Sequence, residues 1–263
     1  SSWKPHTPPE RKLMLNKISV ALGSIAVGLG LVLTGCSGAP APTEAKTVTV
    51  FAAASMKPTF EVLKTTFEAA HPGTTVALNY AGSQALATQL VEGAKADVFV
   101  SANDTQMKVV TDAGLNANDP QVFATNQLEI AVPPANPAKI ATFTDLSKQG
   151  VKLVVCAPAV PCGAATVKVE KATGITLKPV SEEQDVTSVL NKVKTAEADA
   201  GLVYKTDVIS AGDAVTGIEF PESSDAINRN PVVLLKSAPQ AELGQAWIDL
   251  LFSEQGQIGR AHV

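Results

Sequence analysis

The chain has 263 residues, of which 45% are hydrophobic, and a formal net charge of −4 at pH 7. This length and composition allow a substantial core, in one large domain or in two lobes of ordinary size. The mildly acidic balance provides no basic surface for nucleic acid, which we exclude as a partner. Aromatic residues make up only 5%, and the abundance of Ala, Val, Gly and Thr favours short parallel strands packed against small-residue helices.

The first 36 residues have the pattern of an export signal rather than of a folded segment. A basic start, with Met14 before it as a candidate translation start, precedes an apolar run over residues 18–33. This run is too short and too rich in Gly for a membrane-spanning helix. Its ending, Leu33-Thr34-Gly35-Cys36, resembles the bacterial lipobox. We therefore predict an extension and lipoprotein signal peptide over residues 1–36, with Cys36 as the lipidation site, on the extracytoplasmic side of the cell membrane. A plain cleaved signal or an anchor helix is the alternative.

Two further cysteines fit an exported chain. Cys156 and Cys162 are an even pair in an oxidising compartment, and the turn-forming stretch Ala157-Pro158-Ala159-Val160-Pro161 separates them. A disulfide is the simplest outcome, and two free thiols are the alternative. A metal site needs more ligands than two cysteines, and the three histidines show no ligand spacing. We therefore expect no metal cation site and no cofactor.

Strand-like and helical patterns alternate in the first half of the chain. Residues 37–46 are a proline-rich flexible tether, and the folded part is expected to start near Thr47. Apolar residues then recur every three or four positions from Met56 to Ala70, which predicts an amphipathic helix that ends at His71-Pro72-Gly73. The other expected elements are strands at 48–52, 75–80 and 97–101, a helix from Ser83, and a helix capped by Asn103-Asp104.

The pattern restarts after Asn126. The expected strands are 128–132, 152–156, 201–204 and 232–235, and the expected helices are 164–172, 185–195 and 239–252. This alternation predicts parallel sheets with helices on both faces, and two such units predict a cleft between lobes. We assign lobe 1 to residues 47–128 and 234–263 and lobe 2 to residues 129–233, with crossovers near 126–131 and 230–234.

Two strand ends carry groups that suit a small dianion. A fully deprotonated oxyanion accepts hydrogen bonds at every oxygen, so backbone N–H groups at helix N-termini and neutral hydroxyls can hold it. Phe51-Ala52-Ala53-Ala54-Ser55 ends one strand and is expected to place Ser55 at the N-cap of the next helix. Ala81-Gly82-Ser83-Gln84 has the same form after the second strand. Both serines lie at carboxyl ends of strands, where open α/β sheets bind ligands. Ordinary helix capping is the alternative role for each serine.

Four segments, in this order, resemble the molybdate-binding proteins of ABC importers. They are Val50-Phe51-Ala52-Ala53-Ala54-Ser55, Tyr80-Ala81-Gly82-Ser83, Ala96-Asp97-Val98-Phe99-Val100-Ser101-Ala102 and Gly201-Leu202-Val203-Tyr204-Lys205-Thr206-Asp207. The resemblance runs from about Thr47 to Gly256. It implies an α/β, two-lobed periplasmic-binding-protein fold of type II. Each lobe is then a mostly parallel sheet flanked by helices, and the ligand lies in the cleft between the lobes.

The resemblance also implies a ligand and its contacts. In that family two serine hydroxyls, backbone amides and a tyrosine hydroxyl hold the anion. The matching positions here are Ser55, Ser83, Cys162, Val186 and Tyr204. Cys162 stands in Val160-Pro161-Cys162-Gly163 and, like Val186, would contribute its amide. The implied function is capture of molybdate or tungstate by a monomer without catalytic activity, which delivers the anion to an importer permease with its ATPase.

Other interpretations stay open from the sequence. A receptor for sulfate or thiosulfate would bind an anion of the same charge and shape. An exported serine hydrolase would need a histidine near Ser55 or Ser83, and only His71 lies in the folded body, at the far end of the first helix. A sensor or adhesive lipoprotein is the third alternative. Residues 258–263 depart from the longer apolar ending of the family, so we expect the last helix to differ.

Overall fold

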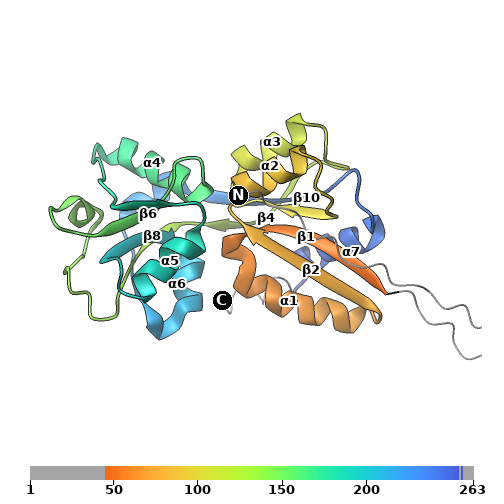
Figure 1. The fold of residues 1–263 in the computed structure, drawn as a ribbon, viewed down its shortest axis with the longest axis horizontal. Coiled ribbons are helices and arrows are strands. Elements are labelled where there is room, and N and C mark those ends of the chain that lie inside the picture. The colour runs from red at the N-terminus through yellow and green to blue at the C-terminus, as the bar shows by residue number, and fades with distance from the viewer. Residues whose placement is uncertain (1–44, 255, 257–263) are drawn as a thin grey trace, which may run out of the picture. The chain divides into compact units, whose positions relative to one another are not determined.

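The computed structural model describes residues 45–254 and 256 (Figure 1). The predictions for the signal peptide, for Cys36, for most of the tether and for residues 258–263 lie outside the described residues. Within the described part, every helix is too short or too polar to cross a lipid bilayer.

The first of two sheets has five strands in the order β2-β1-β3-β10-β4. Their bounds are β1 (Lys46–Ala53), β2 (Thr74–Ala81), β3 (Val98–Val100), β4 (Gln121–Asn126) and β10 (Asn228–Leu234). β1 pairs in parallel with β2 and β3, and β10 pairs antiparallel with β3 and β4. The carboxyl end of β1 is fully buried, as expected for a central strand with helices on both faces.

Helices cover both faces of the first sheet (Figure 1). A 3-10 turn, η1 (Ala54–Met56), leads into α1 (Lys57–Ala70), and α1 shares one hydrophobic cluster with α7 (Ala241–Phe252). A second cluster holds α2 (Ser83–Val91) and α3 (Asp104–Asp112). Trp247 of α7 is fully buried, with its ring centroid 5.4 Å from that of Phe60 and 5.5 Å from that of Phe67. These aromatic contacts fix the amphipathic helix that the sequence predicts.

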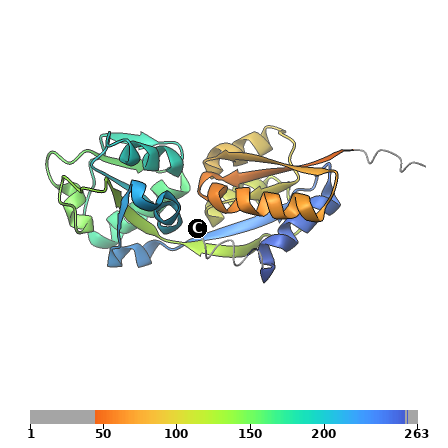
Figure 2. The same cartoon turned by 90° about the horizontal axis from the view of Figure 1, so that it is seen from below.

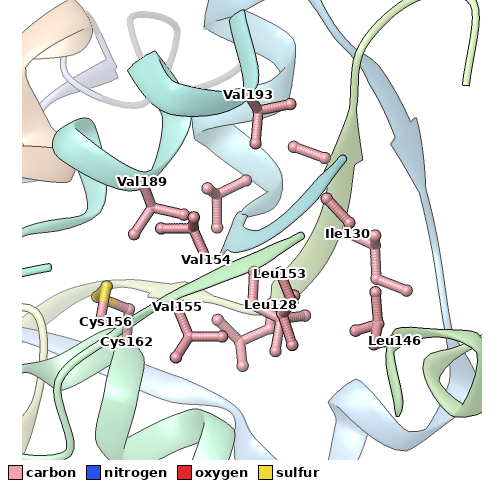
Figure 3. Packing of buried hydrophobic residues seen from close by; sticks show 14 of the residues in the cluster. Leu128, Ile130, Leu146, Leu153, Val154, Val155, Cys156, Cys162, Val189 and Val193 are labelled. Carbon is pink, nitrogen blue, oxygen red and sulfur yellow. A yellow bond between two sulfur atoms is a disulfide. The ribbon is translucent and has the colours of Figure 1, made fainter. Parts of the chain in front are cut away.

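The second sheet has the order β7-β6-β8-β5-β9. Its strands are β5 (Leu128–Val132), β6 (Leu153–Cys156), β7 (Ser181–Glu183), β8 (Ala200–Tyr204) and β9 (Thr216–Ile218). The helices are α4 (Pro161–Thr173), α5 (Val186–Lys194) and α6 (Lys205–Ala211), with 3-10 turns η2 (Phe143–Ser147), η3 (Gly212–Ala214) and η4 (Pro221–Ala226). One hydrophobic cluster, in which Val154 and Val189 face each other, fills the interior (Figure 3).

Each sheet contains three neighbouring parallel strands and adds antiparallel strands beside them. The predicted fold class, two α/β units of mostly parallel strands flanked by helices, is confirmed. β4, β7, β9 and α6 are additional elements that the sequence patterns do not indicate.

The chain passes between the sheets at two places that lie side by side. β5 of the second sheet follows β4 of the first after one residue, and β10 returns the chain to the first sheet. β4 and β10 run side by side between the two halves (Figure 2). They pair antiparallel, with Asn228 opposite Asn126. Strand pairing therefore assigns the chain to the first sheet from Asn228 on, whereas the apolar patterns predict that residues up to 233 belong to the second lobe. The polar start of β10 hides this strand from an apolar pattern.

Candidate functional site

One pocket collects residues from the ends of strands in both sheets. It is lined by Ala53, Ala54, Ser55, Gly82, Ser83, Ala102, Val160, Pro161, Cys162, Val186 and Tyr204. All five positions that the family resemblance implies as ligand contacts are therefore brought together. The cavity volume is about 10 Å³, and a single water needs roughly 10–15 Å³ on this measure. The pocket is therefore nearly closed, with room for about one water, and a sugar or a peptide would not fit.

Ser55 presents a buried hydroxyl that has no hydrogen-bond partner within the described chain. The prediction that Ser55 caps the next helix is wrong. Ser55 is the middle residue of η1, the N-cap of α1 is Met56, and no side chain caps either element. A buried hydroxyl without a partner costs free energy. In this position, on the wall of the pocket, the hydroxyl is free to donate to a guest.

Ser83 is also a wall residue with an available proton. It is the first residue of α2, whose N-cap is Gly82, so the capping prediction is wrong here too. The Ser83 hydroxyl oxygen instead accepts a hydrogen bond from the Ala102 backbone N–H at 3.0 Å. Because the oxygen is already an acceptor, the hydroxyl proton remains for donation into the pocket.

Tyr204 is the last residue of β8 and is only 2% exposed. Its hydroxyl oxygen accepts a hydrogen bond from the side-chain amide of Asn228. Burial raises the pKa of the Tyr204 hydroxyl, the nearby Asp207 carboxylate raises it further, and the Asn228 contact opposes both. The hydroxyl therefore stays protonated and, like that of Ser83, has its proton available for the pocket.

Three helices point their N-termini at the pocket. Ser83 begins α2, Pro161 is the first residue of α4, and Val186 is the first residue of α5. The first backbone N–H groups of a helix have no partner within it and carry the positive end of the helix dipole. None of the pocket-lining residues in the described part of the chain carries a charge. The site therefore offers neutral donors, which suit an anion.

A disulfide supports the part of the wall that α4 provides. Cys156 at the end of β6 is bonded to Cys162 in the first turn of α4, with a Cα–Cα distance of 5.7 Å (Figure 3). The predicted pairing is thus present in the structure. Gly163 lies so close to β6 that a Cβ there would stand 1.9 Å from the Ala157 carbonyl oxygen. Both features hold the amides of this turn against the end of β6.

Hydrogen bonds join the two halves around the pocket. The Gln84 side-chain amide donates to the Gln184 carbonyl oxygen at 2.8 Å, and that of Gln106 donates to the Ala159 carbonyl oxygen at 3.2 Å. Gln84 and Gln106 belong to helices of the first sheet, and their acceptors lie beside the second. The structure is therefore in a closed arrangement.

A second, larger pocket does not suit an anion. It has a volume of about 350 Å³ and its wall includes Glu129, Lys205 and Glu219. Lys205 forms an ion pair with Glu219. Burial raises the pKa of Glu129, Glu219 raises it further, and Lys205 lowers it, so one cation serves two carboxylates. The negative balance of this wall opposes binding of an oxyanion.

Two contributions to the site were not foreseen from the sequence. The Ala102 N–H holds Ser83, and the Asn228 amide holds Tyr204. Neither has a local signal, because each partner lies far away in the chain.

His71, the one described histidine, stacks on Phe67 with centroids 4.1 Å apart and hydrogen-bonds the Phe67 carbonyl oxygen. Within the described residues, no group of three or more His, Cys, Asp or Glu could hold a metal ion.

Comparisons with known proteins give the family. The pattern that defines the bacterial extracellular solute-binding proteins matches residues 48–258. The molybdate-binding protein ModA of Mycobacterium tuberculosis H37Rv is 45% identical over 246 residues, which cover 91% of this chain and 94% of that protein. ModA of Escherichia coli K12 is 29% identical over 218 residues, which cover 79% of this chain and 84% of that protein.

Solved structures agree on the fold. The periplasmic molybdate-binding protein of Azotobacter vinelandii has a TM-score of 0.72 at 18% identity, covering 82% of this chain and 96% of that one. The sulfate-binding protein SubI of Mycobacterium tuberculosis has a TM-score of 0.70 at 17% identity, covering 82% of this chain and 85% of that one. This chain therefore belongs to the family of bacterial extracellular solute-binding proteins, as a relative of the molybdate-binding proteins within it.

Proposed function

We propose that this protein captures molybdate, or the similar anion tungstate, outside the cytoplasm and delivers it to an ABC importer. The observation that carries the proposal is the set of three hydroxyls, those of Ser55, Ser83 and Tyr204, that line one uncharged pocket with their protons unused. The amides at the starts of α4 and α5, from Cys162 and Val186, would complete the donor set. The relative at 45% identity, named for molybdate, supports the same ligand.

A pocket of this composition selects by protonation state. Every polar group that we assign to the guest is a donor, so each oxygen of the guest must accept. Molybdate, tungstate and sulfate are fully deprotonated near neutral pH. Phosphate keeps a proton there, and its P–OH group would face donors without finding an acceptor. We therefore expect phosphate to bind weakly.

Sulfate is the main alternative ligand because its charge and shape match those of molybdate. The structural likeness to a sulfate-binding protein is at 17% identity and concerns the fold alone. A hydrolase function is less well supported. The His71 ring is occupied by Phe67 at the C-terminal end of α1 and does not reach Ser55 or Ser83. We accordingly propose a binding protein without catalytic activity.

The proposal extends to the location of the protein. We propose that Cys36 carries lipid and that residues 37–46 tether a monomeric two-lobed body to the outer face of the cell membrane, near the permease. Mass spectrometry of membrane-extracted protein should find acyl chains on the peptide that begins at Cys36. A soluble protein without acyl chains would contradict the anchor and leave the binding function intact.

Calorimetry and thermal unfolding with four anions test the ligand. Molybdate and tungstate should raise the melting temperature strongly, sulfate less, and phosphate least, because at equal concentration the ligand that binds the native state more tightly stabilises it more. Equal stabilisation by sulfate and molybdate would overturn the choice of ligand. No stabilisation by any of the four would overturn the function.

A further inference from the structure

Asn228 joins the strand that crosses between the sheets to the tyrosine of the pocket. It is the first residue of β10, in the first sheet, and is only 4% exposed. Its side-chain nitrogen donates to the hydroxyl of Tyr204 at the end of β8, in the second sheet. The same nitrogen lies 3.5 Å from the carbonyl oxygen of Pro161. Tyr204 and Pro161 both line the pocket, whereas Asn228 stands behind them.

The contact with Pro161 fixes which way the Asn228 amide faces. A carbonyl oxygen only accepts hydrogen bonds, so the NH₂ group, not the oxygen of the amide, must face Pro161. A flipped amide would set two acceptors against each other. Since this same NH₂ group also reaches Tyr204, the tyrosine oxygen must accept. Its single proton is then directed away from Asn228.

We propose that Asn228 is a positioning residue that keeps the Tyr204 hydroxyl as a donor toward the bound oxyanion. This inference rests on the proposed function and adds a selectivity device to it. A tyrosine hydroxyl that is free to rotate can accept a hydrogen bond from a guest as well as donate one. With Asn228 behind it the hydroxyl only donates, so a guest oxygen that carries a proton is rejected at this position.

Asn126 provides a matched control. It lies opposite Asn228 in the β4–β10 ladder and is 9% exposed. Its side-chain nitrogen also crosses to the second sheet, where it donates to the Thr206 hydroxyl at 2.8 Å. Thr206 does not belong to the wall of the pocket. Asn126→Ala therefore removes a similar bond from the same rung, together with the bond that the Asn126 oxygen accepts from the Gln127 N–H at 3.1 Å, without releasing Tyr204.

A double-mutant cycle tests the proposal with the full chain. Molybdate dissociation constants are measured by calorimetry for the wild type, Asn228→Ala, Tyr204→Phe and the double variant. Asn228→Ala should weaken binding about threefold to tenfold, the usual net effect of one neutral hydrogen bond. In the Tyr204→Phe background the same substitution should have almost no effect, because its target is gone. Asn126→Ala should change affinity by less than about twofold in either background.

Additive losses from Asn228→Ala and Tyr204→Phe would overturn the proposal, because Asn228 would then act on the structure in general. If Asn126→Ala also weakened binding in the wild type and had almost no effect in the Tyr204→Phe background, that result would overturn the proposal too. Thermal unfolding of each variant without ligand separates stability from affinity. If the wild type binds sulfate instead of molybdate, the proposed ligand fails, and the same cycle run with sulfate still decides the role of Asn228.

Selectivity gives a second measurement that a merely structural role would not change. In Asn228→Ala the released hydroxyl can accept from phosphate, so the preference for molybdate over phosphate should narrow. Asn228→Asp has nearly the same shape and serves if the alanine variant does not fold. Its carboxylate would accept a hydrogen bond from the Tyr204 hydroxyl and turn that donor away from the guest. Asn228→Asp should therefore bind molybdate more weakly than the wild type, by more than the factor seen for alanine. An unchanged ratio of the phosphate and molybdate dissociation constants in Asn228→Ala would refute this role of Asn228. Wild-type affinity for molybdate in Asn228→Asp would also refute it.

Discussion

The hydroxyl of Ser83 accepts a hydrogen bond from the backbone N–H of Ala102 at 3.0 Å, so the start of α2 is tied to the segment after β3. Ser55, on the same pocket wall, has no such tie within the described chain. The two serines therefore have the same assigned role toward the guest and different roles in the protein itself.

Alanine substitutions should separate these roles. Ser83→Ala leaves the buried Ala102 N–H unpaired and should lower the free energy of unfolding by about 1–3 kcal/mol. Ser55→Ala removes a buried hydroxyl without a partner and should leave the ligand-free stability unchanged or slightly higher. Each variant should bind molybdate more weakly by about 1.5–3 kcal/mol, because a hydrogen bond to a charged oxygen is lost. Urea denaturation and calorimetry give the two quantities. Full affinity in both variants would leave the serines without the assigned role.

Gly82 should be needed for closure. A Cβ at Gly82 would stand 2.3 Å from the Gln184 carbonyl oxygen, across the contact between the two halves. The backbone of Gly82 (φ −60°, ψ 138°) accepts alanine without strain. Gly82→Ala should therefore fold normally and bind molybdate more weakly by about 1–3 kcal/mol, the usual cost of added atoms in a packed contact.

Gln84→Ala is the control for the Gly82 variant. It removes the 2.8 Å bond to Gln184 and adds no atoms, so its effect should stay near about 1 kcal/mol. Small-angle X-ray scattering should show that ligand fails to compact the Gly82→Ala protein fully. Normal compaction with normal affinity would show that the segment around Gln184 can move to make room for the added methyl group, and would contradict this prediction.

The sequence indicates the larger elements well and the smaller ones poorly. α1 has an apolar stripe whose members, such as Phe60, Leu63 and Phe67, are buried against the sheet. β7 has only three residues, none of them apolar, and exists because the backbone of β6 pairs with it. α6 has seven residues of which only Asp207 is buried, so it has no stripe to detect. Tertiary contacts, not local pattern, create these elements.

The same limit applies to the site. The family resemblance names five positions that the structure brings together in one pocket. The local capping rules, in contrast, predict the wrong geometry for Ser55. The chain after β1 continues into a 3-10 turn, which turns Ser55 inward instead of across the helix end. Asn228 stands in the polar run Asn228-Arg229-Asn230-Pro231, which has the composition of a loop. Its role depends on a partner 24 positions away in the chain.

The disulfide should contribute both to stability and to binding. It closes a short loop, with a sequence separation of 6, for which chain entropy gives a stabilisation of about 2 kcal/mol. The Cys156→Ala/Cys162→Ala double variant should lose about this much unfolding free energy. It should also bind molybdate more weakly, because the Cys162 amide is no longer held against β6. A reductant should lower both the unfolding free energy and the molybdate affinity of the wild type, and it should change neither quantity in the double variant. Equal affinity of both proteins would mean that Gly163 packing alone positions the turn.

Asp207 should make stability depend on pH. Burial raises the pKa of its carboxyl to about 7, the Tyr204 N–H opposes this shift, and the Asp185 carboxylate adds to it. The unfolded state, with an ordinary pKa near 3.8, releases its proton earlier than the native state as the pH rises. The contribution of Asp207 to stability should therefore be greatest below about pH 4, fall as the pH rises to about 7, and stay level above it.

Asp207→Asn isolates this effect because the asparagine oxygen can still accept from the Tyr204 N–H, as Asp207 does at 2.9 Å. Urea denaturation between pH 4.5 and 8.5 should give a flatter profile, with the variant more stable than the wild type at pH 8.5 and similar to it at pH 4.5. The exposed substitution Asp213→Asn, in η3, controls for the loss of one charge. Burial of the Glu129 carboxyl acts in the same direction, so a residual slope of the same sign should remain in Asp207→Asn and become smaller when Glu129→Gln is added. A variant whose profile runs parallel to that of the wild type would mean that Asp207 stays charged in the native protein, held by the Tyr204 N–H alone.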